Sequence, residues 1–147
     1  MHSVERVIIS HWHADHSGGL LSFLKYRNEH QSNYGQQGGS VAVVADLHPN
    51  RPIARGIAPP PTFTKVICRL PEDPTFEDIR TLGGIVELHD EPHVVAGDTV
   101  YISGEIPRVT EFERGLLGSV RWTETELGPN WVPEPVYALR QLLLFFC

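Results

Sequence analysis

The sequence predicts an α/β fold in a single domain, because two apolar strands flank a helix near the start of the chain. Apolar and β-branched residues at 4–9 and 41–45 are typical of buried strands. Between them, apolar residues recur at helical spacing from Leu20 and predict a helix that continues to about residue 30. Residues 1–45 are therefore expected to form a βαβ unit with a right-handed crossover.

The next part of the chain, residues 46–84, is predicted to be a proline-rich excursion. Five prolines lie before residue 65, and they favour turns and irregular backbone. A short helix is expected near residues 50–55 and a strand near 67–70. Residues 76–82 are expected to form a short helix or an extended stretch.

Strand signals return in the third part of the chain, residues 85–113. Apolar runs at 85–89, 93–95 and 100–106 predict three strands, and a polar turn with a proline joins the first two as a hairpin. Residues 114–147 are predicted to be mostly loop with a truncated C-terminal end.

Composition excludes several classes of protein. The 147 residues carry 12 Lys+Arg and 18 Asp+Glu, a net charge of −6, so we expect no nucleic-acid partner, because binding to phosphates needs clustered basic residues. The longest apolar run, residues 142–147, is far shorter than the roughly 20 residues of a membrane span, so no membrane partner is expected. Cys68 and Cys147 cannot form a disulfide framework. With no signal peptide at the start, we expect a cytoplasmic protein.

The strongest chemical signal is the sequence His-Trp-His-Ala-Asp-His at 11–16, directly after the first strand. Neutral imidazole nitrogens and a carboxylate oxygen suit Zn²⁺, and also iron or manganese. His11 and His13 project to the same side of an extended segment and can chelate one ion. Asp15 and His16 lie one turn further and can reach a second ion. The alternative, that the histidines only cap a strand end, is disfavoured because crowded imidazoles repel when they become protonated.

Other polar residues are candidates for contact with a substrate. His48 follows the second predicted strand, where it either lines the pocket or lies in a surface loop. Glu105 and Arg108 lie at the end of a predicted strand, where Arg can bind a phosphate or carboxylate through two hydrogen bonds. The alternative is an ion pair between them that braces the loop. His89 and His93 flank the predicted hairpin turn and form either a further metal pair or a solvated hairpin.

The sequence at 11–16, called the motif from here on, is followed by Gly-Gly-Leu at 18–20. Together they are similar to the signature of the metallo-β-lactamase superfamily. The resemblance implies an αββα sandwich with one or two metal ions between the sheet edges. It assigns His11 and His13 to the first metal, and Asp15 and His16 to the second. It also implies that a metal-bound hydroxide attacks an ester, thioester, phosphodiester or similar centre, and that Asp15 ligates the second ion or deprotonates the attacking water.

A second stretch resembles one branch of this superfamily. Gly-Glu-Ile-Pro-Arg at 104–108, with Phe-Glu at 112–113, is similar to a segment of the dihydropteroate-synthase-like branch, which includes ribofuranosyl-aminobenzene phosphate synthases. The stretches 45–49 and 131–135 also resemble this branch. The implied protein is a metal-dependent hydrolase or transferase that acts on a small molecule, which for the synthase-like branch is phosphorylated.

The chain also departs from the superfamily pattern. Members place strands before the motif strand and supply a third His, a bridging Asp and a last His downstream, whereas no His follows His93 here. We therefore expect a partial sandwich that lacks N-terminal strands and the C-terminal part, with low stability. The alternative function is a catalytically inactive truncated remnant or interaction module with an incomplete metal site.

Overall fold

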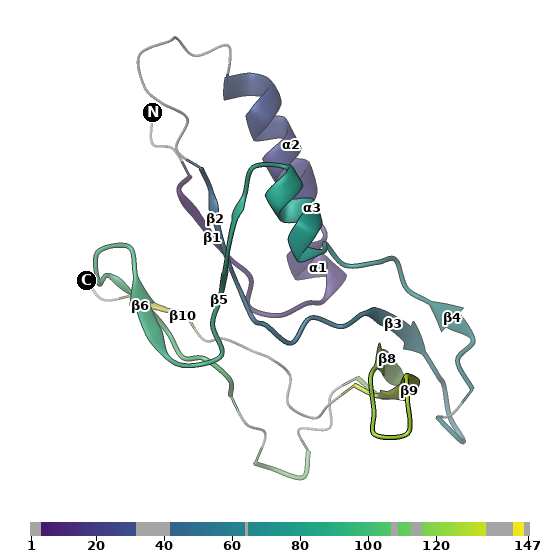
Figure 1. Cartoon of the computed structure of the whole chain (residues 1–147). Helices are drawn as coiled ribbons and strands as arrows, with labels where there is room; N and C mark the ends of the chain where they lie inside the picture. The colour runs from purple at the N-terminus through teal and green to yellow at the C-terminus, as the bar shows by residue number, and fades with distance from the viewer. Residues whose placement is uncertain are drawn as a thin grey trace.

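The structure, a computed structural model, describes residues 4–31, 42–63, 65–106, 109–112, 116–134 and 143–145. These residues form helices and three small sheets (Figure 1). In chain order the elements are β1 (Arg6–Ile8), α1 (Ala14–Ser17), α2 (Leu20–Gln31), β2 (Val44–Leu47), β3 (Ala54–Ile57), β4 (Cys68–Arg69), α3 (Phe76–Thr81), β5 (Ile85–Leu88), β6 (His93–Val95), β7 (Val100–Ile102), β8 (Ser119–Thr123), β9 (Asn130–Pro133) and β10 (Leu143–Phe145).

The central sheet has the strand order β1-β2-β5, and both pairs are parallel. Strand, helix and strand follow one another from β1 through α2 to β2 in the predicted order, although β2 begins at Val44, later than expected. Helices α2 and α3 lie on the same face of this sheet (Figure 1). Parallel strands need such a crossover helix to reverse the chain direction.

Successive side chains of β2 point to opposite faces of the central sheet. Ala45 and Leu47 are fully buried and belong to the core beneath the helices, while Asp46 between them points to the opposite face. The buried core consists of residues in or next to the strands, in the helices and in the loop after β1: Ile9, Trp12, Leu20, Leu24, Val43, Ala45, Leu47 and Ile79. Burial of this apolar set holds α2 and α3 against the sheet.

A four-stranded antiparallel sheet, β4-β3-β8-β9, corrects two predictions. The helix expected at 50–55 is wrong, because β3 pairs with β4 on one side and β8 on the other, and this long-range pairing outweighs the local pattern. The mostly loop region expected at 114–147 contains β8, β9 and β10. Trp122 and Trp131 face each other across β8 and β9, with ring centroids 5.5 Å apart, a cross-strand contact that stabilises such a pair.

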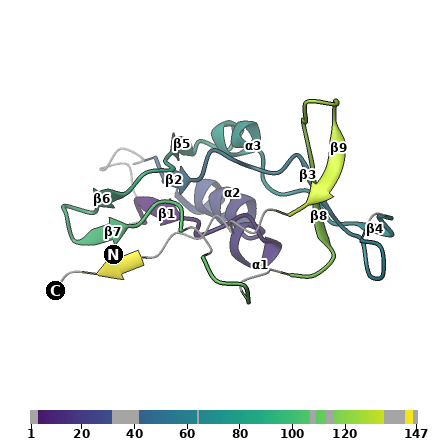
Figure 2. The same cartoon turned by 90° about the horizontal axis from the view of Figure 1, so that it is seen from below.

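The third sheet, β10-β7-β6, shows that the predicted hairpin at 85–95 is wrong. β5 pairs with β2 in the central sheet, whereas β6 pairs with β7, so the turn between them carries the chain from one sheet to another. Figure 2 shows the β6–β7–β10 sheet and the β3–β4–β8–β9 sheet at opposite ends of the molecule. The strands predicted at 93–95 and from Val100 are present, although β7 ends at Ile102.

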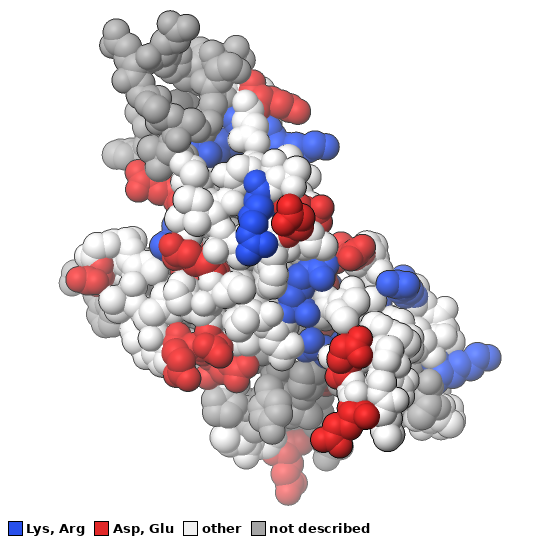
Figure 3. Space-filling view, in the orientation of Figure 1, with Lys and Arg blue, Asp and Glu red and all other residues white. Residues whose placement is uncertain are grey.

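The surface carries charges of both signs. On the face drawn in Figure 3, acidic and basic side chains are interspersed. No helix in the described part of the chain combines the length and the apolar character that a membrane span requires.

Candidate metal centre

Trp12 anchors the motif to the core. Its side chain is only 3% exposed and makes an edge contact with Phe76 at a centroid distance of 5.8 Å. Its indole Nε1–H donates to the carbonyl of His48, 3.2 Å away. Burial of Trp12 leaves the histidines on either side of it, His11 and His13, less deeply buried than the indole.

The second half of the motif forms a single helical turn, α1. The carbonyl of His13 accepts hydrogen bonds from the backbone N–H groups of His16 and Ser17, each at 2.9 Å. Ser17 is the last residue of α1, and α2 begins at Leu20. The turn brings Asp15 and His16 back toward the end of β1.

Three of the four predicted ligands come together. Each of His11, Asp15 and His16 offers a donor atom, and these atoms lie within 4.8 Å of one another. The rings of His11 and His16 are 4.0 Å apart between centroids, and Nε2 of His16 lies 3.5 Å from Oδ2 of Asp15. Ser10 Oγ lies 3.1 Å from Nδ1 of His11 and 3.3 Å from Nδ1 of His16. Two imidazoles and a carboxylate so close together fit the donor set of a zinc site.

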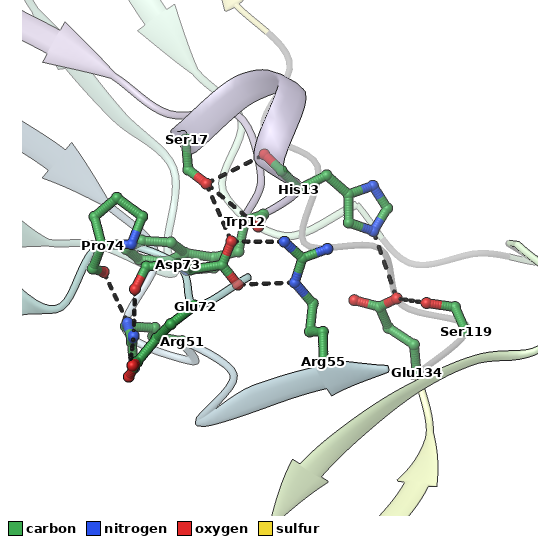
Figure 4. Close-up of polar contacts among 10 residues, drawn as sticks. All are labelled: Trp12, His13, Ser17, Arg51, Arg55, Glu72, Asp73, Pro74, Ser119 and Glu134. Atoms are coloured by element: carbon green, nitrogen blue, oxygen red, sulfur yellow. Dashed lines mark hydrogen bonds and ion pairs between the residues drawn. The ribbon is translucent and has the colours of Figure 1, made fainter. Parts of the chain in front are cut away.

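The fourth predicted ligand, His13, is oriented by a residue far along the chain. Its ring centroid is 4.7 Å from that of His11, but its Nε2 lies 3.5 Å from Oε2 of Glu134, which also accepts a hydrogen bond from Ser119 (Figure 4). Burial opposes ionisation of Glu134, yet the contacts from His13 and Ser119 outweigh it and lower the pKa of this carboxyl. With Nε2 directed at Glu134, only Nδ1 of His13 is left for a metal.

A buried ion pair between Arg55 and Asp73 supports the helical turn of the motif. Arg55 on β3 donates two hydrogen bonds to Asp73, at 2.8 Å and 2.6 Å, and the two side chains are only 4% and 3% exposed. Ser17 Oγ lies 3.4 Å from Oδ1 of the same carboxylate (Figure 4). The helical turn of the motif is thereby tied to a different sheet.

Two of the predicted substrate residues lie close together. Nε2 of His48 is 3.0 Å from Oε1 of Glu105, off the line of a hydrogen bond. The backbone N–H of Asn50 donates to Nδ1 of His48, so a neutral ring carries its proton on Nε2. Burial lowers the pKa of His48, although Glu105 and Asp90 oppose the shift. Arg108, the third predicted residue, lies outside the described residues.

Gly104 explains how Glu105 reaches this position. Its φ of +70° lies in the left-handed region, and a Cβ there would be 2.5 Å from the carbonyl oxygen of Asp90. The backbone N–H of Glu105 donates to the same carbonyl at 3.1 Å. Only glycine permits this close approach, which holds the segment after β7 against the turn between β5 and β6.

Sequence reasoning missed three acidic residues near these sites. Glu134 and Asp73 hold the motif through contacts that link distant segments. Glu134 lies in the stretch 131–135 that resembles the branch, whereas no local pattern marks Asp73. Asp46 has a usable signal: it is a carboxylate within an apolar strand, and a buried charge requires partners. Its contacts are with Arg6, His89 and His93. Of the two alternatives for these histidines, the solvated hairpin is therefore wrong.

The comparisons with known proteins give one match. The family model for the Metallo-beta-lactamase superfamily matches residues 3–142. No curated protein and no solved structure matches significantly. The mixed α/β architecture, with few helices and several sheets, is consistent with a partial fold of this family.

Proposed function

Because the chain belongs to the metallo-beta-lactamase superfamily, we propose that it is a metal-dependent hydrolase or transferase with its centre at the motif. The observation that carries the proposal is the convergence of His11, Asp15 and His16, whose donor atoms lie within 4.8 Å of one another. His13 lies beside this set, with its ring centroid 4.7 Å from that of His11, and Glu134 contacts its Nε2 in the way that carboxylates commonly orient metal-binding histidines.

Each residue of the motif has a different role in the proposed reaction. When bound, zinc makes a coordinated water more acidic and provides a nucleophile near neutral pH. His11 and His16 would hold the ion through imidazole nitrogens. Asp15, whose side chain is 78% exposed, would bind a second ion or, with a single ion, orient a water molecule and accept its proton. Trp12 keeps the turn in place and does not react.

We place the substrate among small, phosphorylated molecules. Support comes from the resemblance of residues 104–108 to the dihydropteroate-synthase-like branch. His48 adds a second argument, because its buried Nε2 makes no hydrogen bond within the described part of the chain. This N–H can donate to a substrate oxygen. Glu105 beside it can accept from a hydroxyl or amine.

The test combines metal content with activity. The purified chain, loaded separately with zinc, iron or manganese, is analysed for bound metal and assayed with a generic phosphodiester and a generic thioester. We expect near-stoichiometric metal, and hydrolysis that falls to background in His11→Ala and His13→Ala. His30→Ala is the matched control, since this exposed histidine stacks on Tyr26, well away from the motif in sequence, and should behave like the wild type.

The alternative is an inactive chain with an incomplete metal site that serves as an interaction module. The direction of His13 toward Glu134 favours this alternative, because it leaves three donors facing one another. A folded protein that takes up no metal under these conditions, or that binds metal without hydrolysing either substrate, would support the alternative over the enzyme.

A further inference from the structure

A second group of metal-type ligands lies outside the motif, where the chain leaves the central sheet. Asp46 belongs to β2 and is fully buried, His89 directly follows β5, and His93 begins β6. Nδ1 of His89 lies 3.0 Å from Oδ1 of Asp46, and Nε2 of His93 lies 3.1 Å from Oδ2. The three residues each offer one donor atom, all within 4.8 Å of one another.

We propose that Asp46, His89 and His93 form a second site that binds one divalent transition-metal ion, with zinc the best fit. This site shares no residue with the motif, and the proposal does not depend on the proposed function. Two nitrogen donors and one carboxylate oxygen select zinc, cobalt or nickel over magnesium and calcium, which prefer oxygen ligands.

The proton arrangement at His93 is the first argument. Its Nδ1 lies 3.1 Å from the carbonyl oxygen of Glu91. A carbonyl only accepts, so Nδ1 must carry the proton in this contact. In a neutral ring Nε2 then presents a lone pair to Oδ2 of Asp46, which also carries lone pairs. Two acceptors at 3.1 Å repel, and a cation between them removes the repulsion.

Charge balance is the second argument. Arg6 donates to Asp46 and to Glu87, each at 2.7 Å. One guanidinium therefore faces two carboxylates, and the group retains a net negative charge if both imidazoles are neutral. A buried carboxylate such as Asp46 requires compensation, and a cation held by the neutral rings supplies it.

The spacing suits a shared ion. Two ligand atoms of a tetrahedral zinc ion, each about 2.0–2.1 Å from the metal, lie about 3.3 Å apart. The observed nitrogen–oxygen distances of 3.0 Å and 3.1 Å are within a few tenths of an ångström of that value. The rings of His89 and His93 are 4.0 Å apart between centroids. With side chains 35% and 17% exposed, they leave a route for an ion to reach the buried carboxylate.

The experiment first removes two of the motif's metal ligands and then measures the metal binding that remains. In a His11→Ala/His16→Ala background, cobalt is followed by its visible absorption and zinc by competition with a chromophoric chelator. We expect about one equivalent to bind, and to be lost when His89→Gln and His93→Gln are added. His30→Gln in the same background should retain the full equivalent. Equal binding with and without the two substitutions at His89 and His93 would overturn the proposal.

A second measurement covers the case in which the quadruple variant does not fold. Imidazole ¹⁵N signals of the wild-type chain are recorded at pH 7.5 with and without zinc. The proposal predicts that His89 and His93 respond together, with the Nε2 signal of His93 moving to the value of a metal-bound nitrogen. If His93 is found protonated on both nitrogens and unchanged by zinc, the cluster is an ion pair only and the site does not exist.

Discussion

Replacement of Asp73 by asparagine tests how the motif is held in place. The substitution keeps the shape of the side chain but removes the charge that faces Arg55, whose two hydrogen bonds to this carboxylate are 2.8 Å and 2.6 Å long. Both side chains are almost fully buried, with 4% and 3% exposed. The guanidinium would be left without its counter-charge, and Ser17 on the motif turn would lose an ionised neighbour.

The expected loss is large for one substitution. Removing one partner of a buried pair costs about 3–5 kcal/mol because the other charge remains desolvated. For Asp73→Asn we expect the free energy of unfolding to decrease by about 3 kcal/mol, the lower end of this range, because the amide oxygen still accepts one hydrogen bond. A domain of this size loses roughly 2–4 °C in Tm per kcal/mol, so the expected decrease is about 10 °C. Whole-domain stabilities are about 5–15 kcal/mol, so this variant would lose a large share.

Urea unfolding followed by Trp fluorescence and circular dichroism, in buffer with a chelator, measures the effect without bound metal. The control is Glu77→Gln, which removes an exposed ion pair with Arg80 at 3.9 Å and should leave the midpoint unchanged. A second variant, Arg55→Met/Asp73→Leu, replaces both charges and should recover much of the stability lost by Asp73→Asn. If Asp73→Asn unfolds at the same urea concentration as Glu77→Gln, the ion pair does not brace the motif.

Three further changes test individual contacts. Gly104→Ala should destabilise the protein by more than about 2 kcal/mol in urea unfolding, because strain at positive φ adds to a clash with backbone; Gly97→Ala, with positive φ but open space, should cost about 1 kcal/mol. The contacts of Asp78 with Thr75 lower the pKa of its carboxyl below the ordinary value, so its contribution is present above about pH 4 and is lost as the pH falls through the folded pKa. The difference in urea midpoint between the wild type and Asp78→Asn should therefore be smaller at pH 3 than at pH 6. An equal difference at both pH values would contradict this. Trp12→Phe keeps an aromatic ring in the core but removes the indole donor, and a cost of about 1–3 kcal/mol is expected from the buried carbonyl left unpaired; unchanged thermal unfolding would show that the hydrogen bond is dispensable.

Local pattern was enough to find the motif. His11, Asp15 and His16 lie within six residues of sequence, so a strand end followed by one helical turn is enough to bring them near one another. The same holds for the start of α2, where Leu20 and Leu24, four positions apart, are both buried. Features that depend on a few consecutive residues are therefore the ones that the sequence predicts well.

Long-range pairing could not be predicted in the same way. β3 forms between β4 and β8, and the neighbour across from Ala54 is Trp122, far along the chain. The contact that orients His13 spans 121 positions to Glu134. Hydrophobic periodicity does not say which distant strand will pair, so a strand of this kind was mistaken for a helix. Asp46 is a long-range contact that the sequence does indicate, because a lone carboxylate in an apolar strand requires compensating partners elsewhere in the chain.

The two groups of donors differ in how much chain each one encloses. The ends of the motif group, His11 and His16, are separated by five positions, whereas His93 and Asp46 are separated by 47 positions. By loop-closure entropy alone, gathering the distant pair in an unfolded chain costs about 2 kcal/mol more than gathering the local one. Weak chelation by the motif can therefore survive in a denatured or proteolysed chain, while chelation at Asp46 reports that the sheets are correctly assembled.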